Sequence, residues 1–467
     1  MQRRAGEVGT VVAELDIGRA WLVDPVAVRE GPGEIVVRGG VIEAVTWLEG
    51  AEAEGVDAGG VVVAPGFVDL HAHLREPGAE DAETIATGLA AAAHGGFATV
   101  CTMADTSPAA DEPGVVARVR AAAVASGSPI ELLPYGTVTV GRGGERLAAL
   151  GELADAGVVA FSDDPAPIRS AAVLRSALAY AGALGVVVVD HAEDPALTEG
   201  AQAADGYVAT VLGLRGWPAA AEEAIVARDL ALLADVVRDV PAARLHLAHL
   251  SAGGSFDLVR RAKADGLPVT CDVAPHHLAL TDAWLAGARS WAWEASDDPW
   301  TDGSIVAAPY EPGLRLVPPL RSGADAVACL AALADGTADA VATDHAPQTS
   351  VDKDVEFADA APGMPGLETA LGLLLLAVDA GRLSLARAVA ALSIGPGSVL
   401  GGRSRRRSFG LAAGTPADLV VFDRSDRWTV SSSSLATKGS RSPLVGRDLP
   451  GRVLLTIADG RLVYEDA

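Results

Sequence analysis

The sequence predicts an α/β protein: a (β/α)8 barrel of the TIM type, with a smaller β-sandwich domain built from both ends of the chain. Two observations predict this fold. In the middle of the chain, eight short apolar runs alternate with Ala-rich stretches, which is the pattern of strand–helix units around a parallel sheet. The first and last sixty residues instead contain short apolar runs and Gly-rich turns. A doubly wound open sheet is the alternative, but no Gly-x-Gly-x-x-Gly turn follows a first strand.

The barrel elements follow from these runs in chain order. The eight strands are expected at residues 66–73, 97–103, 130–138, 158–163, 185–191, 244–250, 268–274 and 338–345. The clearest helical stretches between them are expected at residues 83–94, 144–154, 171–183, 254–264 and 324–334. Repeated strand-then-helix units of this kind fit a closed barrel of eight parallel strands.

The domain limits follow from the same change in pattern. Residues 1–63 and 405–467 are expected to form the small β domain, and residues 64–404 the barrel. Segment 284–316, between the seventh and eighth strands, is rich in Trp, Pro and Asp and has little periodicity. Loops of that length are typically lids or poorly ordered segments.

Composition excludes several classes of protein. The net charge of −25 over 467 residues argues against nucleic acid or an anionic membrane as partner. No apolar run is long enough to span a membrane, and no apolar region follows the basic N-terminus as in a secretory signal. The three cysteines, Cys101, Cys271 and Cys329, are far apart, which is typical of a protein in the reducing cytoplasm.

Histidine and aspartate residues gather where the predicted strands end. Residues i and i+2 of a strand point the same way, and barrel enzymes place their sites at the C-terminal ends of the strands. Each of these residues follows an apolar run, where an unpaired polar group would be costly. The residues are His71, His73, Asp163, Asp164, His191, His249 and Asp344.

These residue types predict a metal site. Imidazole nitrogen and carboxylate oxygen are the ligands that zinc-like divalent metals prefer. Four histidines and one bridging carboxylate can hold two metals, with Asp344 as a further ligand. A two-metal site polarises a carbonyl and lowers the pKa of a bridging water to roughly 7, so we expect metal-assisted hydrolysis of an amide-type bond.

The remaining histidines fit other roles. His246 has the wrong strand parity relative to His249 and is expected to pack or hydrogen-bond outside the barrel lumen. His276 and His277 follow the seventh strand and suit a supporting role more than ligation. His94 precedes Gly95 and Gly96, as at a helix C-terminus, and His345 faces away if Asp344 faces the site.

The motifs are specific enough to identify a family. In chain order they are PGFVDLHAHLREPG, FSDD, DHAEDP, HLAHLSAGGS, PHHLALTD, PPLR, DGTADAVATDHAP and GLETAL. From about residue 35 to the C-terminus, the chain resembles the type I dihydroorotases of the amidohydrolase superfamily. The HLREPG and TDHAP motifs favour dihydroorotase over the similar hydantoinases and allantoinases.

The resemblance implies two zinc ions in the barrel. His71 and His73 would bind one, His191 and His249 the other, and Asp164 would bridge them. Many relatives bridge with a carboxylated lysine, but the three lysines of this chain, Lys263, Lys353 and Lys438, lie at no strand end of the barrel. Asp344 would contact the first metal and act as general base, then as general acid.

The resemblance also implies the reaction and the partners. The reaction would be the reversible cyclisation of N-carbamoyl-L-aspartate to dihydroorotate, the third step of pyrimidine synthesis. The substrate would be a small cyclic amide, and the protein would form a homo-oligomer that could associate with aspartate transcarbamoylase.

The departures from the family all fall on the group that holds the substrate carboxylate. The family's arginine is present as Arg75, but Asp105 replaces one asparagine, Val317 a second asparagine and Gln348 a histidine. Pro362 and Gly363 are expected as further substrate contacts.

Asp105 is the departure with the largest expected effect. Two carboxylates about 4 Å apart repel by roughly 4 kcal/mol at an effective dielectric constant near 20. Asp105 could also pair with Arg75 and occupy the group meant for the substrate, unless the loops rearrange and Asp105 points away.

Three functions therefore remain open: a dihydroorotase with an altered carboxylate pocket, a related hydrolase of another hydantoin, imide or ureide, and a non-catalytic partner of aspartate transcarbamoylase. The complete set of ligand residues argues against the third.

Overall fold

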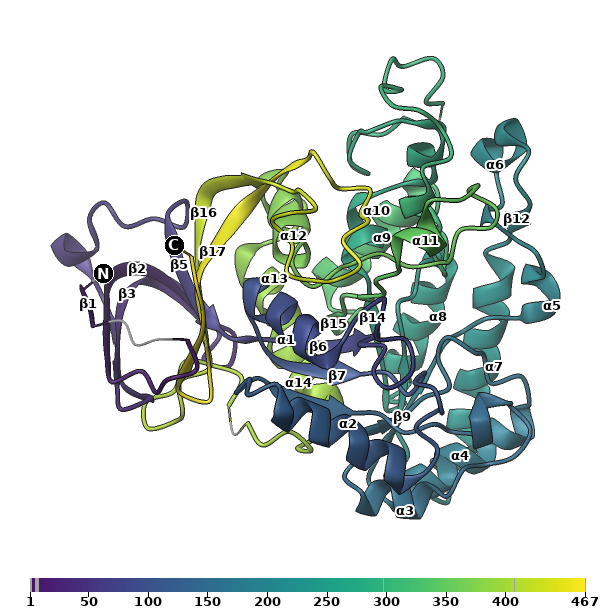
Figure 1. Cartoon of the computed structure of the whole chain (residues 1–467), viewed down its shortest axis with the longest axis horizontal. Coiled ribbons are helices and arrows are strands. Elements are labelled where there is room, and N and C mark those ends of the chain that lie inside the picture. Colours follow the sequence, from purple (N-terminus) through teal and green to yellow (C-terminus); the bar gives the residue numbers. More distant parts are fainter. Residues whose placement is uncertain (1, 5–7, 297, 407, 467) are drawn as a thin grey trace.

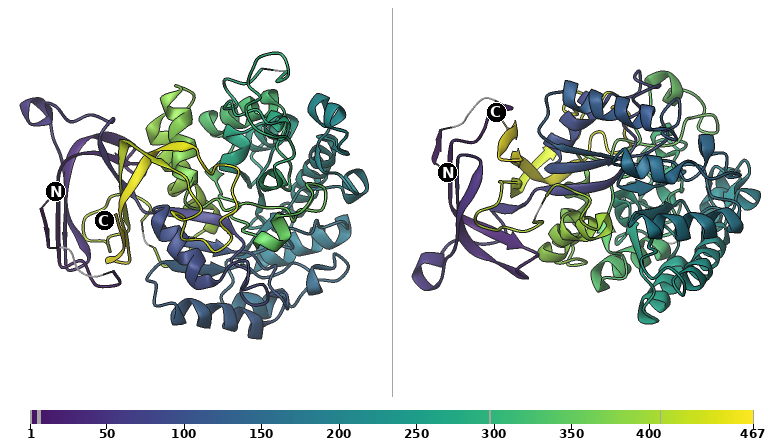
Figure 2. Two further views of the ribbon diagram at one scale, coloured as in Figure 1. Left: turned by 45° about the horizontal axis from the view of Figure 1, so that its top comes forward. Right: turned by 90° about the horizontal axis from the view of Figure 1, so that it is seen from below.

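A computed structural model describes residues 2–4, 8–296, 298–406 and 408–466 of the chain. The outermost limits of the expected domains, at residues 1 and 467, lie outside the described residues. The molecule has two lobes, a helix-rich barrel and a small β domain that holds both ends of the chain (Figure 1). Two further views show the same separation (Figure 2).

Eight parallel strands form the barrel, as predicted. They are β6 (Phe67–Ala72), β7 (Phe97–Thr102), β8 (Glu131–Pro134), β9 (Ala160–Phe161), β10 (Val187–Asp190), β13 (Leu245–Leu247), β14 (Val269–Val273) and β15 (Ala340–Val341). Strands β6–β7–β8 pair in parallel, and so do β9–β10–β13–β14–β15. Single parallel bridges, Gly136 with Phe161 and Ala72 with His345, close the ring between the two sets. Each strand is shorter than the range predicted for it.

Helices connect the strands and cover the outside of the barrel. The main ones are α1 (Ile85–His94), α2 (Pro113–Ala125), α3 (Leu150–Asp155), α4 (Ala171–Ala183), α7 (Ala220–Val236), α8 (Gly253–Ala264), α10 (Gly323–Asp335), α12 (Ala370–Asp379), α13 (Leu385–Leu392) and α14 (Ile394–Leu400). The helix expected at residues 144–154 was predicted to begin too early. Gly144 has φ +75, a left-handed conformation that ends a turn rather than starting a helix, and α3 begins six residues later.

Shorter elements lie in the loops. They are α5 (Pro195–Thr198), α6 (Tyr207–Leu212), α9 (Pro275–Ala279), α11 (Ser350–Lys353), β11 (Ala203–Ala204), β12 (Gly216–Trp217) and the 3-10 turns η1 (Gly50–Ala53), η2 (Val140–Arg142), η3 (Asp282–Ala286) and η4 (Pro312–Leu314). Within the described residues, no helix has the length and apolar character needed to cross a membrane.

Both ends of the chain build one small β domain, as predicted for a β sandwich, and its described strands are hydrogen-bonded into one continuous sheet. Its strands are β1 (Gln2–Arg4), β2 (Glu14–Asp24), β3 (Arg29–Arg38), β4 (Val41–Trp47), β5 (Val61–Pro65), β16 (Leu419–Thr429), β17 (Asp448–Ala458) and β18 (Arg461–Glu465). The order is β18-β17-β16-β5-β2-β3-β4, with β1 beside β2. Antiparallel pairing of β5 with β16 joins the two ends. The exact limits at residues 64 and 404 stay a prediction.

Segment 284–316 packs against the barrel over its described residues. Trp284 is completely buried and contacts Trp291, with ring centroids 5.7 Å apart. Leu314 and Leu316 join the same apolar cluster. The segment contributes to the projection at the top of Figure 1, and side-chain packing rather than regular structure holds it.

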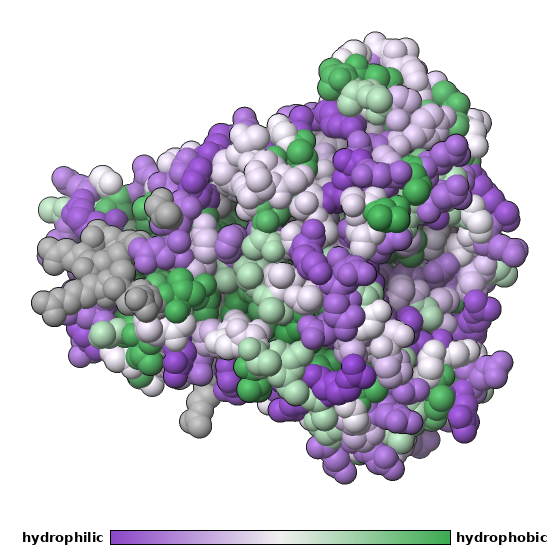
Figure 3. All heavy atoms as spheres, viewed as in Figure 1, coloured by the Kyte–Doolittle hydropathy of each residue, from purple (hydrophilic) through white to green (hydrophobic). Residues whose placement is uncertain are grey.

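The polarity of the surface and the unpaired state of the cysteines are as expected from the sequence. Hydrophilic side chains cover much of the face in Figure 3, with apolar ones in scattered patches. Cys101, Cys271 and Cys329 are buried and free, as their spacing predicted.

Candidate active site

The predicted ligand residues meet at the C-terminal rim of the barrel. His71 and His73 come from the end of β6, and Asp164, His191, His249 and Asp344 follow β9, β10, β13 and β15. Their exposed fractions lie between 1% and 7%. Burial of so many polar side chains is costly unless they are paired or hold a metal, so this group is the candidate site.

Asp164 lies at the centre of the group. Its Oδ1 is 3.1 Å from His71 Nε2 and 3.5 Å from His73 Nε2. Its Oδ2 is 3.0 Å from His249 Nε2 and 3.4 Å from His191 Nδ1. Each oxygen of one carboxylate therefore faces one pair of histidines, which is the arrangement that a bridging ligand requires.

Asp163, the other acid of FSDD, is not part of the group. Its Oδ1 accepts hydrogen bonds from the backbone amides of Val138 and Thr139, both at 2.9 Å. The carboxylate holds the loop after β8 against β9. The structure thus separates the two neighbouring acids and places Asp164, the one named as the bridge, among the histidines.

Asp344 faces the first histidine pair. Its Oδ1 lies 3.8 Å from His71 Nε2 and 3.9 Å from His73 Nε2. Asp344 and His249 have φ of +49 and +35, a region that costs non-glycine residues free energy and is often found at functional sites. A hydrogen bond from its amide to Asp272 holds the backbone of His249 in place.

The donor set fits divalent metals. Two clusters have all their ligand atoms within 4.8 Å of one another: His71, His73 and Asp344; and His71, Asp164 and His249. Facing ring nitrogens lie close together, His71 Nε2 with His73 Nε2 at 3.2 Å and His191 Nδ1 with His249 Nε2 at 3.1 Å. Ligand atoms around tetrahedral zinc stand about 3.3 Å apart, given Zn–N bonds near 2.0 Å.

The electrostatics of the group also suit cations. Burial lowers the pKa of His71, but Asp164 more than offsets this effect and raises it to about 10. Burial likewise opposes the charged form of His191, and hydrogen bonds with Asp164 and Glu193 raise its pKa to about 10. Burial would raise the pKa of Asp164, yet the histidines hold it well below its usual value. A metal must displace these protons, so its binding is coupled to pH.

Outer carboxylates orient the histidines, and the sequence did not single out two of them. His191 Nε2 lies 2.9 Å from Glu193 Oε2, and the His249 backbone amide donates to Asp272 Oδ1 at 2.6 Å. The Glu193 contact fixes the His191 ring and raises its basicity, whereas Asp272 holds the backbone of His249. Two features of the sequence could have indicated these residues: Glu193 stands two positions after His191, and Asp272 is an acid within the apolar seventh strand.

Asp105 plays the same part for His73 and also pairs with Arg75. Asp105 Oδ2 lies 2.8 Å from His73 Nδ1 and 3.1 Å from Arg75 Nη1. Burial opposes its ionisation, but His73 and Arg75 lower the pKa of Asp105 to about 2. The alternative in which Asp105 points away is wrong, because its carboxylate contacts both His73 and Arg75 within the site.

The other expected substrate contacts are already engaged within the chain. Val317 packs beside the apolar cluster that includes Trp217. Gln348 donates its amide hydrogen to the Pro362 carbonyl at 2.7 Å, and the Gly363 amide donates to the Arg315 carbonyl at 2.9 Å. The structure brings Gln348 and Pro362 together, while Val317 offers the site no hydrogen bond.

Two further histidines support the site. His276 Nε2 lies 3.8 Å from Asp344 Oδ2, and burial lowers the pKa of His276 to about 4, so its ring is neutral. His277 donates to the Pro318 carbonyl at 3.2 Å. Neither belongs to the two ligand clusters found among the described residues, in line with the predicted supporting role.

The remaining three histidines contact residues outside the ligand group. His246 hydrogen-bonds to Thr270 at 2.8 Å and Asp272 at 2.7 Å. His94 lies 3.4 Å from a Glu368 oxygen at the end of α1. His345 turns toward Glu83, at 3.4 Å, and so faces away from the ligand group as expected.

Comparisons with known proteins agree with this geometry. A family model described as "Dihydro-orotase-like" matches residues 60–252, and one described as "Amidohydrolase family" matches residues 284–464. A dihydroorotase of Anaeromyxobacter dehalogenans is 44% identical over 447 residues, 95% of this chain and 96% of the relative. One of Streptomyces coelicolor is 44% identical over 439 residues, 93% of this chain and 96% of the relative.

Solved structures share the fold. An L-hydantoinase from Arthrobacter aurescens has a TM-score of 0.78 and 24% sequence identity, with 96% of each chain covered. A dihydropyrimidinase from Brevibacillus agri has a TM-score of 0.73 and 21% identity, with 97% of this chain and 95% of that chain covered. At this identity the likeness concerns the architecture of barrel and β domain.

Proposed function

Since this chain belongs to the dihydroorotase family of amidohydrolases, we propose that it catalyses the reversible cyclisation of N-carbamoyl-L-aspartate to (S)-dihydroorotate in pyrimidine synthesis. The observation that carries the proposal is the position of Asp164 between two histidine pairs, on a chain whose curated relatives are dihydroorotases over nearly their whole length. The reaction hydrolyses or forms one ring amide bond.

The family implies a metal cofactor, and we propose that it is a pair of zinc ions. His71 and His73 would hold one ion, His191 and His249 the other, with Asp164 shared between them. When bound, the pair supplies Lewis-acid polarisation of the amide carbonyl and acidification of the attacking water. Asp344 would complete the first ligand set.

Asp344 is proposed to move the proton. In the hydrolytic direction, its carboxylate takes a proton from the attacking water while the water oxygen bonds to the amide carbon. As the ring C–N bond breaks, the same group returns that proton to the ring nitrogen. His276 is neutral and 3.8 Å from Asp344, so it can accept or donate a hydrogen bond without adding a competing charge.

The pairing of Arg75 with Asp105 favours a second candidate function. Arg75 is the family's anchor for the substrate carboxylate, yet its Nη1 already lies 3.1 Å from Asp105 Oδ2. A neutral cyclic ureide or imide would leave this pair intact and would meet no carboxylate repulsion. The second candidate is therefore a related hydrolase of uncharged cyclic amides.

One assay separates these functions. Zinc-loaded protein is given dihydroorotate, dihydrouracil, hydantoin and succinimide, with His71→Ala as the control for metal-dependent turnover. Dihydroorotate opening faster than the uncharged substrates supports the first function, and the reverse order supports the second. Turnover of all four substrates at the level of His71→Ala, with fewer than one zinc per chain, would support the non-catalytic alternative.

We also propose a cytoplasmic location and a homo-oligomer, with possible association with aspartate transcarbamoylase. Sedimentation of the protein alone and mixed with that enzyme tests both associations. A single monomeric species in both experiments would contradict them.

A further inference from the structure

Glu83 is a completely buried carboxylate that joins separate parts of the chain near the site. It lies just before α1, and its Oε1 accepts hydrogen bonds from the Thr84 amide at 3.2 Å and from the Thr87 hydroxyl. A buried carboxylate is costly unless such bonds compensate it. Its second oxygen, Oε2, points toward His345, at 3.4 Å.

His345 connects this carboxylate to the residue proposed to move the proton. Its Nδ1 accepts a hydrogen bond from the Gly366 amide at 3.1 Å, so the ring proton lies on Nε2, which faces Glu83. The His345 carbonyl accepts from the His73 amide at 2.8 Å. The ring and backbone of His345 therefore fix the chain directly after Asp344, whose φ of +49 needs support.

A segment of the small domain holds Glu83 from the other side. We call residues 434–444, between β16 and β17, the strap; its yellow ribbon reaches across to the barrel (Figure 1). The Thr437 hydroxyl donates to Glu83 Oε2, and the Lys438 amide donates to Oε1 at 3.3 Å. A Cβ on Gly439 would stand 2.6 Å from the Gln348 carbonyl, so the strap also lies directly on the loop after Asp344.

We propose that Glu83 is a positioning residue: through His345 it holds the backbone of Asp344 for proton transfer, and the strap holds Glu83. The inference rests on the proposed function of Asp344. It makes the strap, which comes from the C-terminal part of the chain, a part of the active-site support. Outer partners of this kind typically change activity by about 10- to 100-fold.

The test uses one severe and two conservative variants of the full chain. Glu83→Gln keeps the size and removes the charge, Glu83→Ala removes the group, and Thr437→Val removes only the hydroxyl. Thr456→Val is the matched control, because Thr456 lies in the same small domain and its buried hydroxyl also donates to the barrel, to the Ala93 carbonyl of α1 at 2.8 Å. Each variant is assayed for kcat, KM, zinc per chain and Tm.

We expect Glu83→Gln to lower kcat by about 10- to 100-fold with KM changed less than about threefold and zinc content retained. Thr437→Val should lower kcat in the same way by about three- to tenfold, Glu83→Ala by more than Glu83→Gln, and Thr456→Val by less than about twofold. Wild-type kcat in both Glu83→Gln and Thr437→Val would overturn the proposal. So would losses in kcat that follow Tm across all variants, control included.

A second readout does not depend on turnover. With ¹⁵N-labelled histidine, the His345 ring nitrogen signals should move in Glu83→Gln and Thr437→Val and stay in place in Thr456→Val. If the wild type opened none of the cyclic amides, the proposed function would fail, and these signals would still test whether Glu83 and the strap hold the His345 ring. Unmoved signals in both site variants would overturn that linkage and the positioning role with it.

Discussion

Replacing Asp105 by asparagine should change which substrates the site prefers. Asp105 Oδ2 contacts Arg75 Nη1 at 3.1 Å and His73 Nδ1 at 2.8 Å. The substitution keeps the size of the side chain and an acceptor for His73, but removes the negative charge. Arg75 then has no internal carboxylate and is free for a carboxylate of the substrate.

Two opposing effects set the magnitude. A substrate carboxylate near Arg75 would lie about 4 Å from Asp105, and removing the repulsion of roughly 4 kcal/mol corresponds to about a thousandfold. Loss of the charged partner of His73 should cost about 10- to 100-fold for every substrate. The net expectation for dihydroorotate is a gain of about 10- to 100-fold in kcat/KM. Dihydrouracil lacks the carboxylate, so its kcat/KM should only fall, by the roughly 10- to 100-fold that the lost partner of His73 costs.

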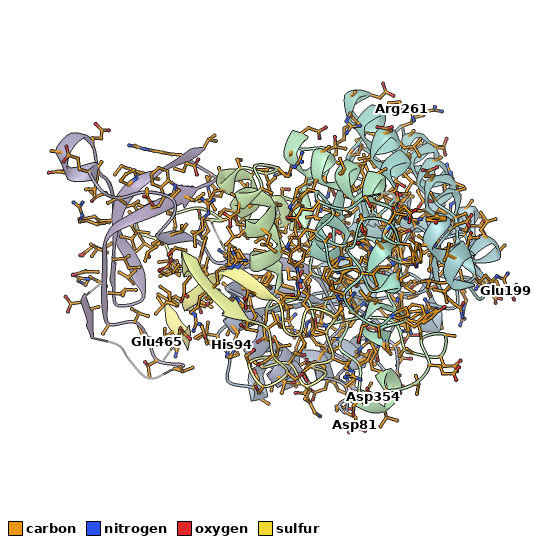
Figure 4. The ribbon with its side chains drawn as sticks, turned by 90° about the horizontal axis from the view of Figure 1, so that it is seen from above. Asp81, His94, Glu199, Arg261, Asp354 and Glu465 are labelled. Atoms are coloured by element: carbon orange, nitrogen blue, oxygen red, sulfur yellow. The ribbon has the colours of Figure 1, made fainter. Side chains whose placement is uncertain are left out.

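The assay is the ratio of kcat/KM for dihydroorotate to that for dihydrouracil, because the ratio cancels the loss common to both. It should rise about a thousandfold in Asp105→Asn and stay constant in Asp81→Asn, a control at an exposed edge of the molecule (Figure 4). Zinc content is measured for both variants. An unchanged ratio at full zinc content would refute the reasoning that Asp105 blocks the anchor.

Three further predictions concern the metal group, a buried lysine and the packed loop. Asp164→Asn should lower zinc below two per chain and kcat/KM by at least about a thousandfold, whereas Asp163→Asn should keep both ions; two ions retained in Asp164→Asn would contradict the bridge. Burial and Arg315 lower the pKa of Lys353 to about 7 from 10.5, so the unfolded chain binds more protons between these values and stability rises with pH there. In urea unfolding, the free energy of unfolding of the wild type should rise relative to that of Lys353→Met by about 1.4 kcal/mol per pH unit above pH 7. If the unfolding free energies of the two proteins changed with pH in parallel, a neutral buried lysine would be excluded. Trp284→Ala should cost about 3–5 kcal/mol and Trp300→Ala, at 38% exposure, under about 1 kcal/mol; equal losses would contradict the packing of segment 284–316.

The grouping of the candidate ligand residues could be predicted because local geometry determines it. His71 and His73 share a face through strand parity, and parallel strands bring their C-terminal ends to one rim. The positions of Asp164, His191, His249 and Asp344 relative to their strands then place all six side chains together. Strand ends alone do not distinguish Asp163 from Asp164, since either could follow the end of β9; the family resemblance indicated Asp164, which is the acid that lies among the histidines.

The supporting contacts could not be predicted because they join residues far apart in the chain. Asp272 reaches His249 across neighbouring strands, and Glu83 meets Thr437 across 354 positions. The start of α3 was misplaced because the prediction extended the Ala-rich run back to Gly144, although the Gly143–Gly144 pair is a turn signal and Gly144 takes a left-handed conformation. These failures concern tertiary contacts and local turns rather than the pattern of the fold.

The sequence left two orientations open for Asp105, paired with Arg75 or pointing away. The observed pairing with Arg75 bears on which substrates the site accepts. At 3.1 Å and a dielectric constant near 20, the gross attraction between Arg75 and Asp105 is about 5 kcal/mol. A substrate carboxylate of the same charge would gain a similar attraction to Arg75, but it would also meet the repulsion of roughly 4 kcal/mol from Asp105. The neighbours offset little of this repulsion. The Val317 side chain has no polar group, and Gln348, one of whose N–H groups donates to Pro362, carries no charge. The pocket therefore recognises its substrate mainly through the ring amide at the metal ligands, and the charge of Asp105 sets how much a carboxylate on that ring is penalised.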